Sequence, residues 1–233
     1  MTSLLTVLPY TAAPVLAAAV GASLVAWRPP SEKTQGFVQH FAAGVVFAAA
    51  AAELLPDLMH RRSLAASLIG AALGVALMLA IREASRKLRG SFGLAAVIGV
   101  DVLVDGLVVG LGFAHGAKQG ILLTIALTIE LLFLALTVSA ELGGSGMPKA
   151  LVAGTAIALS LLLPAGTALG FGVLAGLTDT VVTGLYAFGL VALLYLVTEE
   201  LLVEAHEKPD TPLATAVFFV GFFLMITIDE LIG

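Results

Sequence analysis

Residues 97–113, with the sequence VIGVDVLVDGLVVGLGF, place two carboxylates, Asp101 and Asp105, inside a run that is otherwise apolar. A run of this kind, continued on both sides, is typical of a helix that crosses a lipid bilayer. An ionised side chain at the centre of such a helix costs about 2.5–3.5 kcal/mol on insertion scales, and it therefore marks a functional position. The segment thus predicts both the class of fold and the place of the site.

The composition of the 233-residue chain agrees with a membrane protein. Hydrophobic residues make up 60% and charged residues 12%, whereas soluble proteins average about half and about a quarter. The mean hydropathy is +1.09. The chain has 0 cysteines, which excludes disulfides and thiolate metal sites. The net charge of −5 is modest, and no basic patch suggests a nucleic-acid partner.

Apolar runs of about 20–28 residues recur along the whole sequence. They predict an all-α polytopic membrane protein whose residues 1–233 form one transmembrane domain, with no soluble domain and no removable signal peptide. Glycine and alanine runs such as AAGVVFAAAAA, at 42–52, predict helices whose backbones pack closely. The eight expected transmembrane helices are 4–27, 36–58, 63–88, 92–115, 119–142, 148–174, 179–205 and 211–232.

The distribution of basic residues predicts the orientation in the membrane. Cytoplasmic loops carry an excess of lysine and arginine, so both termini are expected outside. In this orientation the cytoplasmic loops hold eight basic residues, which are Arg28, Lys33, Arg82, Arg86, Lys87, Arg89, Lys149 and Lys208. The outer loops hold three, which are Arg61, Arg62 and Lys118.

A third acidic residue, Glu130, is expected at the depth of Asp105. Asp105 precedes His115 by ten residues and Glu130 follows Gln119 by eleven, so a rise of 1.5 Å per residue brings both near the midplane. Asp101 shares a helix face with Asp105 because the two are four residues apart. On the next helix, Glu130 begins a polar stripe that continues through Thr137 and Glu141.

Three carboxylates that converge in lipid without a basic partner must share protons or bind a cation. Two interpretations therefore remain open. Either Asp101, Asp105 and Glu130 hold a cation, or they are protonated and hydrogen-bonded within the bundle. The first predicts a mid-membrane metal site.

Other polar residues near the helix ends have simpler explanations. Glu53 is deep enough to be an entrance ligand, and Glu199 or Glu200 is placed to receive an ion that leaves the centre. An ordinary helix end explains Asp57, beside Arg61 and Arg62, and solvated helix ends explain His40, His60 and His115, although His115 shares the carboxylate face and is also placed to guard an outer mouth. Solvated positions are expected for Glu204, His206 and Glu207, and no function is assigned to the isolated Asp229. Ser145, within GGSGMP, lacks a nearby base, so an enzyme is not predicted.

The layout resembles the ZIP (Zrt/Irt-like) family of divalent metal transporters. The residues that carry the resemblance are HFAAGVVFAAAAAELLPDL at 40–58, DVLVDGLVVG at 101–110 and GLVALLYLVTEELLVEAHE at 189–207. The resemblance implies a bundle of eight helices and a metal site between the fourth and fifth. It places Asp101 at the family's fourth-helix histidine and Asp105 at the acid that precedes a glycine, here Gly106. Glu130 falls on the first or second ligand position of the fifth helix.

Several departures from the family pattern imply that only one of its two metal positions remains. Val102 replaces the asparagine of the fourth helix, Leu163 replaces a glutamate of the sixth, and Phe133 or Leu134 occupies a ligand position of the fifth. The histidine-rich cytoplasmic loop is also missing. The remaining ligands are all oxygens, which suit harder cations such as Mn²⁺ better than zinc, although carboxylates also bind zinc.

The sequence therefore predicts a carrier that moves Zn²⁺ or a harder cation such as Mn²⁺ or Fe²⁺ toward the cytoplasm across an inner or plasma membrane. The metal is the transported substrate, no cofactor is expected, and waters with Thr128 would complete the shell. Uptake should weaken in acid because the ligands must be deprotonated. The partners are divalent metal ions and the bilayer, and the small-residue faces allow a homodimer. Two other hypotheses remain, a proton- or Na⁺-coupled antiporter and a non-transporting metal sensor or scaffold.

Overall fold

The computed structural model describes residues 3–61, 63–87, 91–144, 147–173, 177–208 and 211–232. Within these ranges every regular element is a helix, and eight stretches are long and apolar enough to cross a membrane. The predicted all-α, multi-pass fold is therefore confirmed. These stretches are Leu4–Trp27, Glu32–His60, Leu64–Lys87, Ala95–His115, Ala117–Ala140, Lys149–Gly172, Asp179–His206 and Pro212–Ile232.

Several of the eight stretches are built from more than one helical segment. Two of them contain a short π-helical segment, η2 and η3, in which backbone hydrogen bonds span five residues instead of four. The elements are α1 (Leu4–Val7), η1 (Leu8–Thr11), α2 (Ala12–Trp27), α3 (Glu32–Ala49), η2 (Ala50–Leu54), α4 (Leu55–His60), α5 (Leu64–Lys87), α6 (Ser91–His115), α7 (Ala117–Gly144), α8 (Lys149–Ser160), α9 (Leu162–Val173), α10 (Asp179–Tyr195), η3 (Leu196–Leu201), α11 (Leu202–His206) and α12 (Pro212–Ile232).

The second stretch starts at Glu32, four residues before the predicted position 36. The hydroxyl of Ser31 accepts a hydrogen bond from the backbone N–H of Thr34 at 3.2 Å and so caps this helix. Polar residues can therefore form the first turn, and a boundary drawn from hydropathy alone misses it.

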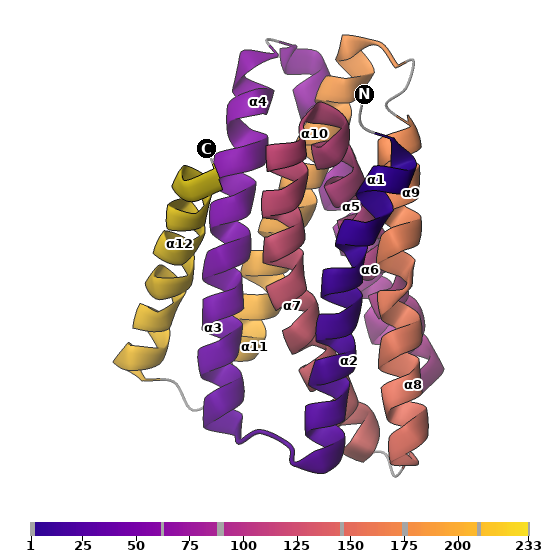
Figure 1. The fold of residues 1–233 in the computed structure, drawn as a ribbon, viewed down its shortest axis with the longest axis vertical. Helices are drawn as coiled ribbons and strands as arrows, with labels where there is room; N and C mark the ends of the chain where they lie inside the picture. The colour runs from indigo at the N-terminus through magenta and orange to yellow at the C-terminus, as the bar shows by residue number, and fades with distance from the viewer. Residues whose placement is uncertain are drawn as a thin grey trace.

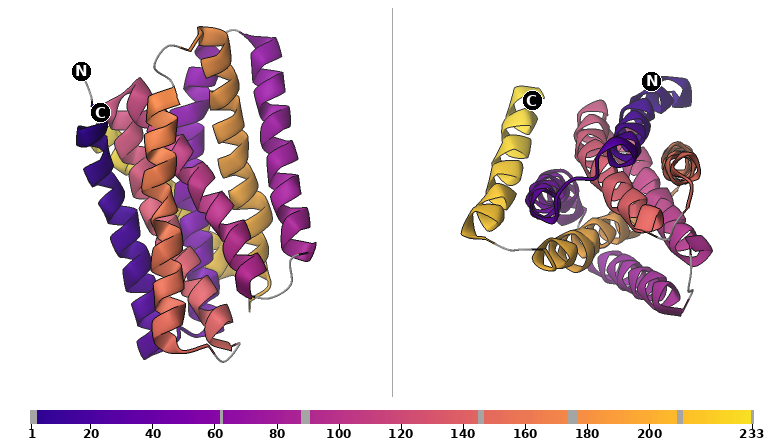
Figure 2. Two further views of the ribbon diagram at one scale, coloured as in Figure 1. Left: turned by 90° about the vertical axis from the view of Figure 1, so that its right-hand side faces the viewer. Right: turned by 90° about the horizontal axis from the view of Figure 1, so that it is seen from below.

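The short connections make successive stretches antiparallel, so both chain termini lie toward one end of the bundle (Figures 1 and 2). We call this the termini end, and it also holds the C-terminus of α6 and the N-terminus of α7. The opposite end is called the basic end. Among the described residues, the basic end holds Arg28, Lys33, Arg82, Arg86, Lys87, Lys149 and Lys208, and the termini end holds Arg61 and Lys118.

Glycines bring several pairs of helices into backbone contact, as the glycine and alanine runs predicted. A Cβ atom on Gly106 of α6 would clash with the carbonyl oxygen of Leu163 on α9, and one on Gly166 of α9 would clash with the carbonyl of Leu103. α3 and α12 pack in the same way, through Gly44. Such small-residue contacts replace the hydrophobic driving force that is missing between helices in lipid.

α6 and α7 lie at the centre of the bundle. In the α6 stretch 67% of the most apolar window is buried, compared with 11% in α12. α12 lies at the edge, beside α3 (Figures 1 and 2). The two helices that carry the candidate ligands are therefore among the best shielded from lipid.

Candidate metal centre

α6 and α7 bring together the three carboxylates that the sequence predicted at one level. One carboxylate oxygen from each of Asp101, Asp105 and Glu130 lies within 4.8 Å of the other two. The three side chains are only 5%, 2% and 0% exposed, respectively. We call this group the central carboxylate cluster. Its compactness follows from the four-residue spacing on α6 and from the matching depth of Glu130 on α7.

Three oxygens of this cluster have no hydrogen-bond partner among the described residues. They are Oδ2 of Asp105 and both carboxylate oxygens of Glu130. A buried polar atom without a partner is costly, and a buried charge more so. A cation that binds between the carboxylates would satisfy these oxygens, and its charge would offset their mutual repulsion.

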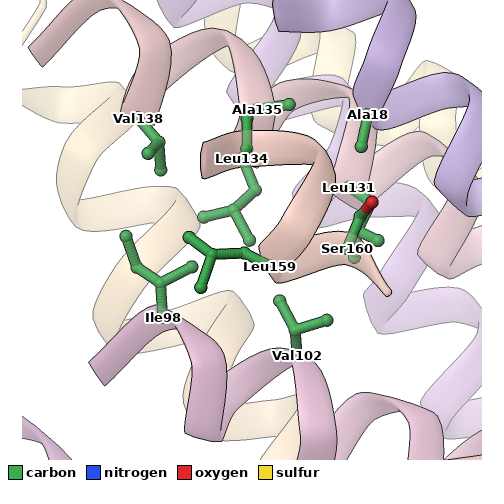
Figure 3. A pocket seen from close by; sticks show the side chains of 10 residues that line it. Ala18, Ile98, Val102, Leu131, Leu134, Ala135, Val138, Leu159 and Ser160 are labelled. Atoms are coloured by element: carbon green, nitrogen blue, oxygen red, sulfur yellow. The ribbon is translucent and has the colours of Figure 1, made fainter. Parts of the chain in front are cut away.

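Val102, which follows Asp101 on α6, lines a crevice with no carboxylate or imidazole among its lining residues. Val102, Leu131, Leu134 and Leu159 point toward one another across this crevice of about 10 Å³ (Figure 3). Ser160 supplies the one oxygen drawn there, and its hydroxyl donates to the backbone carbonyl of Ile157 at 2.7 Å. These apolar side chains do not coordinate metals, which agrees with a single metal position.

A cavity of about 440 Å³ runs from Asp101 to the basic end of the bundle. Exposed Arg82, Ser85 and Arg86 of α5 line its mouth, and Thr137 of α7 lines its interior. Thr137 thus lies along the polar stripe predicted for α7, whereas the side chain of Glu141 lies outside the described residues. Thr128, a predicted ligand, donates to the carbonyl of Thr124 on its own helix at 2.6 Å.

Glu200, and not Glu199, is placed to continue the path from the cluster. Glu199 is 40% exposed, and its Oε2 lies 2.7 Å from Nη1 of Arg82. Glu200 is near enough to Asp101 for the two carboxylates to interact electrostatically. Both glutamates belong to η3, and π-helical segments of this kind are frequent at functional sites.

The termini end above the cluster contains a network of polar side chains. Asp57 of α4 lies 3.0 Å from Nε2 of His115 and accepts a hydrogen bond from Nε2 of Gln119 at 3.1 Å. The same Gln119 nitrogen donates to the backbone carbonyl of Glu53, in η2, at 2.5 Å. Arg61, which is close to Asp57 in sequence, lies 4.7 Å above the ring of Tyr186. Arg62 lies outside the described residues.

Asp229 is not isolated, contrary to the sequence-based expectation. Its Oδ1 lies 2.6 Å from Nζ of Lys118 at the start of α7, and its carboxyl group is near enough to that of Glu53 for the two to interact electrostatically. Glu53 is therefore near a cation that the chain itself supplies. The two polar groups at the termini end, around Asp57 and around Asp229, are both separated from the central cluster by fully buried apolar side chains, which include Leu54, Val108, Val109 and Leu127.

Three polar residues that sequence reasoning treated as solvated, or did not consider, lie near the path. Gln39 is 2% exposed and donates from Nε2 to Oε2 of Glu204 at 2.6 Å. His40 is 1% exposed, and its ring lies 5.2 Å from that of His206. The prediction of a solvated position is therefore wrong for His40, whereas Glu204 is partly exposed and lines the cavity. Gln39 and Glu204 are 165 residues apart in the chain, and no local pattern indicates such a contact.

Comparisons with known proteins do not place this chain in a family. No family model matches it, and no curated protein matches its sequence.

Proposed function

We propose that this protein is a carrier of divalent metal cations with its binding site at the central carboxylate cluster. The observation that carries the proposal is the convergence of three buried carboxylates, with three of their oxygens unpartnered among the described residues, at the inner end of a cavity that opens at one face of the bundle. If the three carboxylates had only a structural role, the cavity that leads to them would have no explanation. The cavity also gives a bound ion a way out, which a site closed on all sides would not.

The ligand set favours hard cations. Asp101, Asp105 and Glu130 offer oxygen donors alone, which suit Mn²⁺ and Mg²⁺, while Fe²⁺ and Zn²⁺ also bind carboxylates. The sequence resemblance to the ZIP family supports a transport function, and the apolar Val102 crevice supports a single central position. We regard the chain as a ZIP-like carrier with a reduced site.

The same proposal includes the orientation and the direction of transport. The basic end faces the cytoplasm, in accordance with the excess of lysine and arginine there, and both termini lie outside. The structure then corresponds to a state in which the cluster communicates with the cytoplasm, and the ion moves inward. Alternating access requires a second state in which the termini end opens and the cavity closes.

Metal uptake into proteoliposomes tests the function. Mn²⁺ outside the vesicles should be taken up by the wild-type protein, and the near-isosteric variants Asp105→Asn and Glu130→Gln should each lose most of this uptake. Glu83→Gln is the matched control, because Glu83 is exposed on α5 and pairs with Lys87 at 3.0 Å. Its uptake should equal that of the wild type.

The other outcomes separate the alternative functions. Undiminished uptake in both cluster variants would overturn the assignment of the site. A response to a pH or Na⁺ gradient that ignores divalent metals would identify an antiporter. Stoichiometric metal binding without any flux would identify a sensor or scaffold.

A further inference from the structure

Gln39, buried on α3, has one amide atom that the fold leaves unpartnered. Its Nε2 donates to Glu204, but its Oε1 has no hydrogen-bond partner among the described residues although the side chain is 2% exposed. A buried amide oxygen without a donor is uncommon, and it calls for a water or an ion. Metals of the hard class accept amide oxygens as ligands.

This amide faces a small void in which acidic groups from two other helices meet. The void measures about 20 Å³ and is lined by Gln39, Glu130, Thr137, Glu200 and Glu204 together with apolar side chains. A volume of this size holds about one water or one dehydrated ion. The void also adjoins the larger cavity, because Thr137, Glu200 and Glu204 line both.

The charges at the void favour a cation. Glu200 and Glu204 both interact electrostatically with Glu130, and Glu200 also interacts with Glu204. Arg82 pairs with Glu199 at the mouth of the cavity and also interacts electrostatically with Glu200, so one positive charge partly offsets several negative ones. Oxygen donors therefore come from carboxylates, an amide and a hydroxyl, with no nitrogen ligand among the lining residues, and this set resembles that of the central cluster in its preference for hard cations.

We propose that Gln39, Glu200 and Glu204 form a second, inner cation site, one step closer to the basic end than the central carboxylate cluster. Glu130 borders both sites, so an ion can move from one to the other without crossing an apolar layer. Two ions that occupy adjacent sites repel each other, and this repulsion assists release toward the cavity. The role of the inner site in transport rests on the proposed function. The existence of the site does not, because binding at the site can be measured without flux.

Equilibrium dialysis of the purified full-length protein against Mn²⁺ tests the site. The wild type should bind two ions per chain. Glu204→Gln keeps an acceptor for the Gln39 amide, and Gln39→Leu preserves the volume of the side chain, so both should fold and each should bind one ion. The double variant Asp101→Asn, Asp105→Asn, which leaves every residue that lines the void unchanged, should bind one ion, held at the inner site. Removal of a ligand should weaken the affected site by about tenfold or more.

Glu207→Gln is the matched control, because Glu207 is exposed on the turn that follows α11, and this variant should bind two ions. Circular dichroism and size-exclusion chromatography verify that each variant is folded. Binding of a single ion by the wild type, retention of two ions by both Glu204→Gln and Gln39→Leu, or loss of both ions in the folded double variant would each overturn the inner site. Uptake accompanied by one bound ion would leave the proposed function intact and reject only the inner site. Two bound ions without uptake would support the inner site and reject the proposed transport function.

Discussion

The ammonium group of Lys118 lies 2.6 Å from the carboxylate of Asp229 and joins the start of α7 to the end of α12. The carboxyl group of Glu53 interacts electrostatically with both the aspartate and the lysine, so three stretches of the bundle meet at this point. The pair between His115 and Asp57 joins α6 to α4 nearby. Together these contacts connect α4, α6, α7 and α12 at the termini end.

The first prediction concerns these contacts. In a Val109→Cys background, Lys118→Gln should increase the rate at which a water-soluble thiol reagent modifies the introduced cysteine, because Asp229 and Glu53 lose their cation and repel each other. Val109 is fully buried between the central cluster and the termini end, and the natural chain has 0 cysteines, so the labelling is specific. Lys118→Arg preserves the charge and serves as the control. Equal rates in both variants would show that the ion pair does not contribute to closure.

The sequence predicted the eight spans to within a few residues because length and hydropathy decide which segments cross a bilayer. It also predicted the central cluster, since Asp101 and Asp105 repeat with the helical period and Glu130 is counted down from the adjacent helix end. Both predictions use only the residue spacing within one helix or within two helices that are consecutive in the sequence.

Contacts between distant helices were not predictable in this way. Gln39 meets Glu204 across 165 positions of sequence, and Lys118 meets Asp229 because the end of α12 contacts α7. The π-helical turn before Leu55 and the one before Leu202 change the rotation of the following residues, so a regular 100° count misplaces the faces beyond them. Burial of His40 likewise depends on α11, which no local pattern places beside α3.

The second prediction tests the close contact of α6 and α9. Gly106→Ala should destabilise the protein by at least about 1–3 kcal/mol, because the added Cβ meets the backbone carbonyl of Leu163, which cannot move aside as a side chain can. Gly154→Ala is the matched control. A Cβ at Gly154 meets nothing within 4 Å, so alanine there should be neutral or should stabilise the helix by about 0.5–1 kcal/mol. Thermal unfolding in detergent compares the two, and equal melting temperatures would contradict the packing.

A third prediction concerns metal-dependent stability and its change with pH. At a free Mn²⁺ concentration of 100 times Kd, the wild type should gain about 2.7 kcal/mol for each site that binds, and chelation should remove the gain. Asp105→Asn should lose the part of the gain that the central cluster supplies. Acid should reduce the wild-type gain, because protons compete with the metal for the carboxylates. Thermal shift assays across a pH series measure these effects, and a gain that grows in acid would refute a carboxylate site.

Metal preference gives a fourth prediction. Asp101→His places an imidazole beside Asp105 and Glu130, and the affinity for Zn²⁺ relative to Mn²⁺ should rise by about tenfold or more because zinc prefers nitrogen donors. Asp101→Asn is the control, since it removes the charge without adding a nitrogen ligand. Its affinities for both metals should fall while their ratio changes little. Competition between the two metals in equilibrium dialysis measures the ratio, and an unchanged ratio in Asp101→His would place residue 101 outside the coordination sphere.

The last prediction fixes the side from which the cluster is reached. Thr137 lines the cavity that leads from Asp101 to the basic end, so the Thr137→Cys variant should react with a membrane-impermeant thiol reagent supplied at that end. The Val109→Cys variant, with its thiol buried on the other side of the cluster, should react slowly from either side. In vesicles of known orientation, the thiol introduced by Thr137→Cys should be modified only from the cytoplasmic face, and bound Mn²⁺ should slow the reaction by occupying the path. Modification only from the outer face would reverse the proposed orientation and, with it, the assignment of the cavity as an inward-open path.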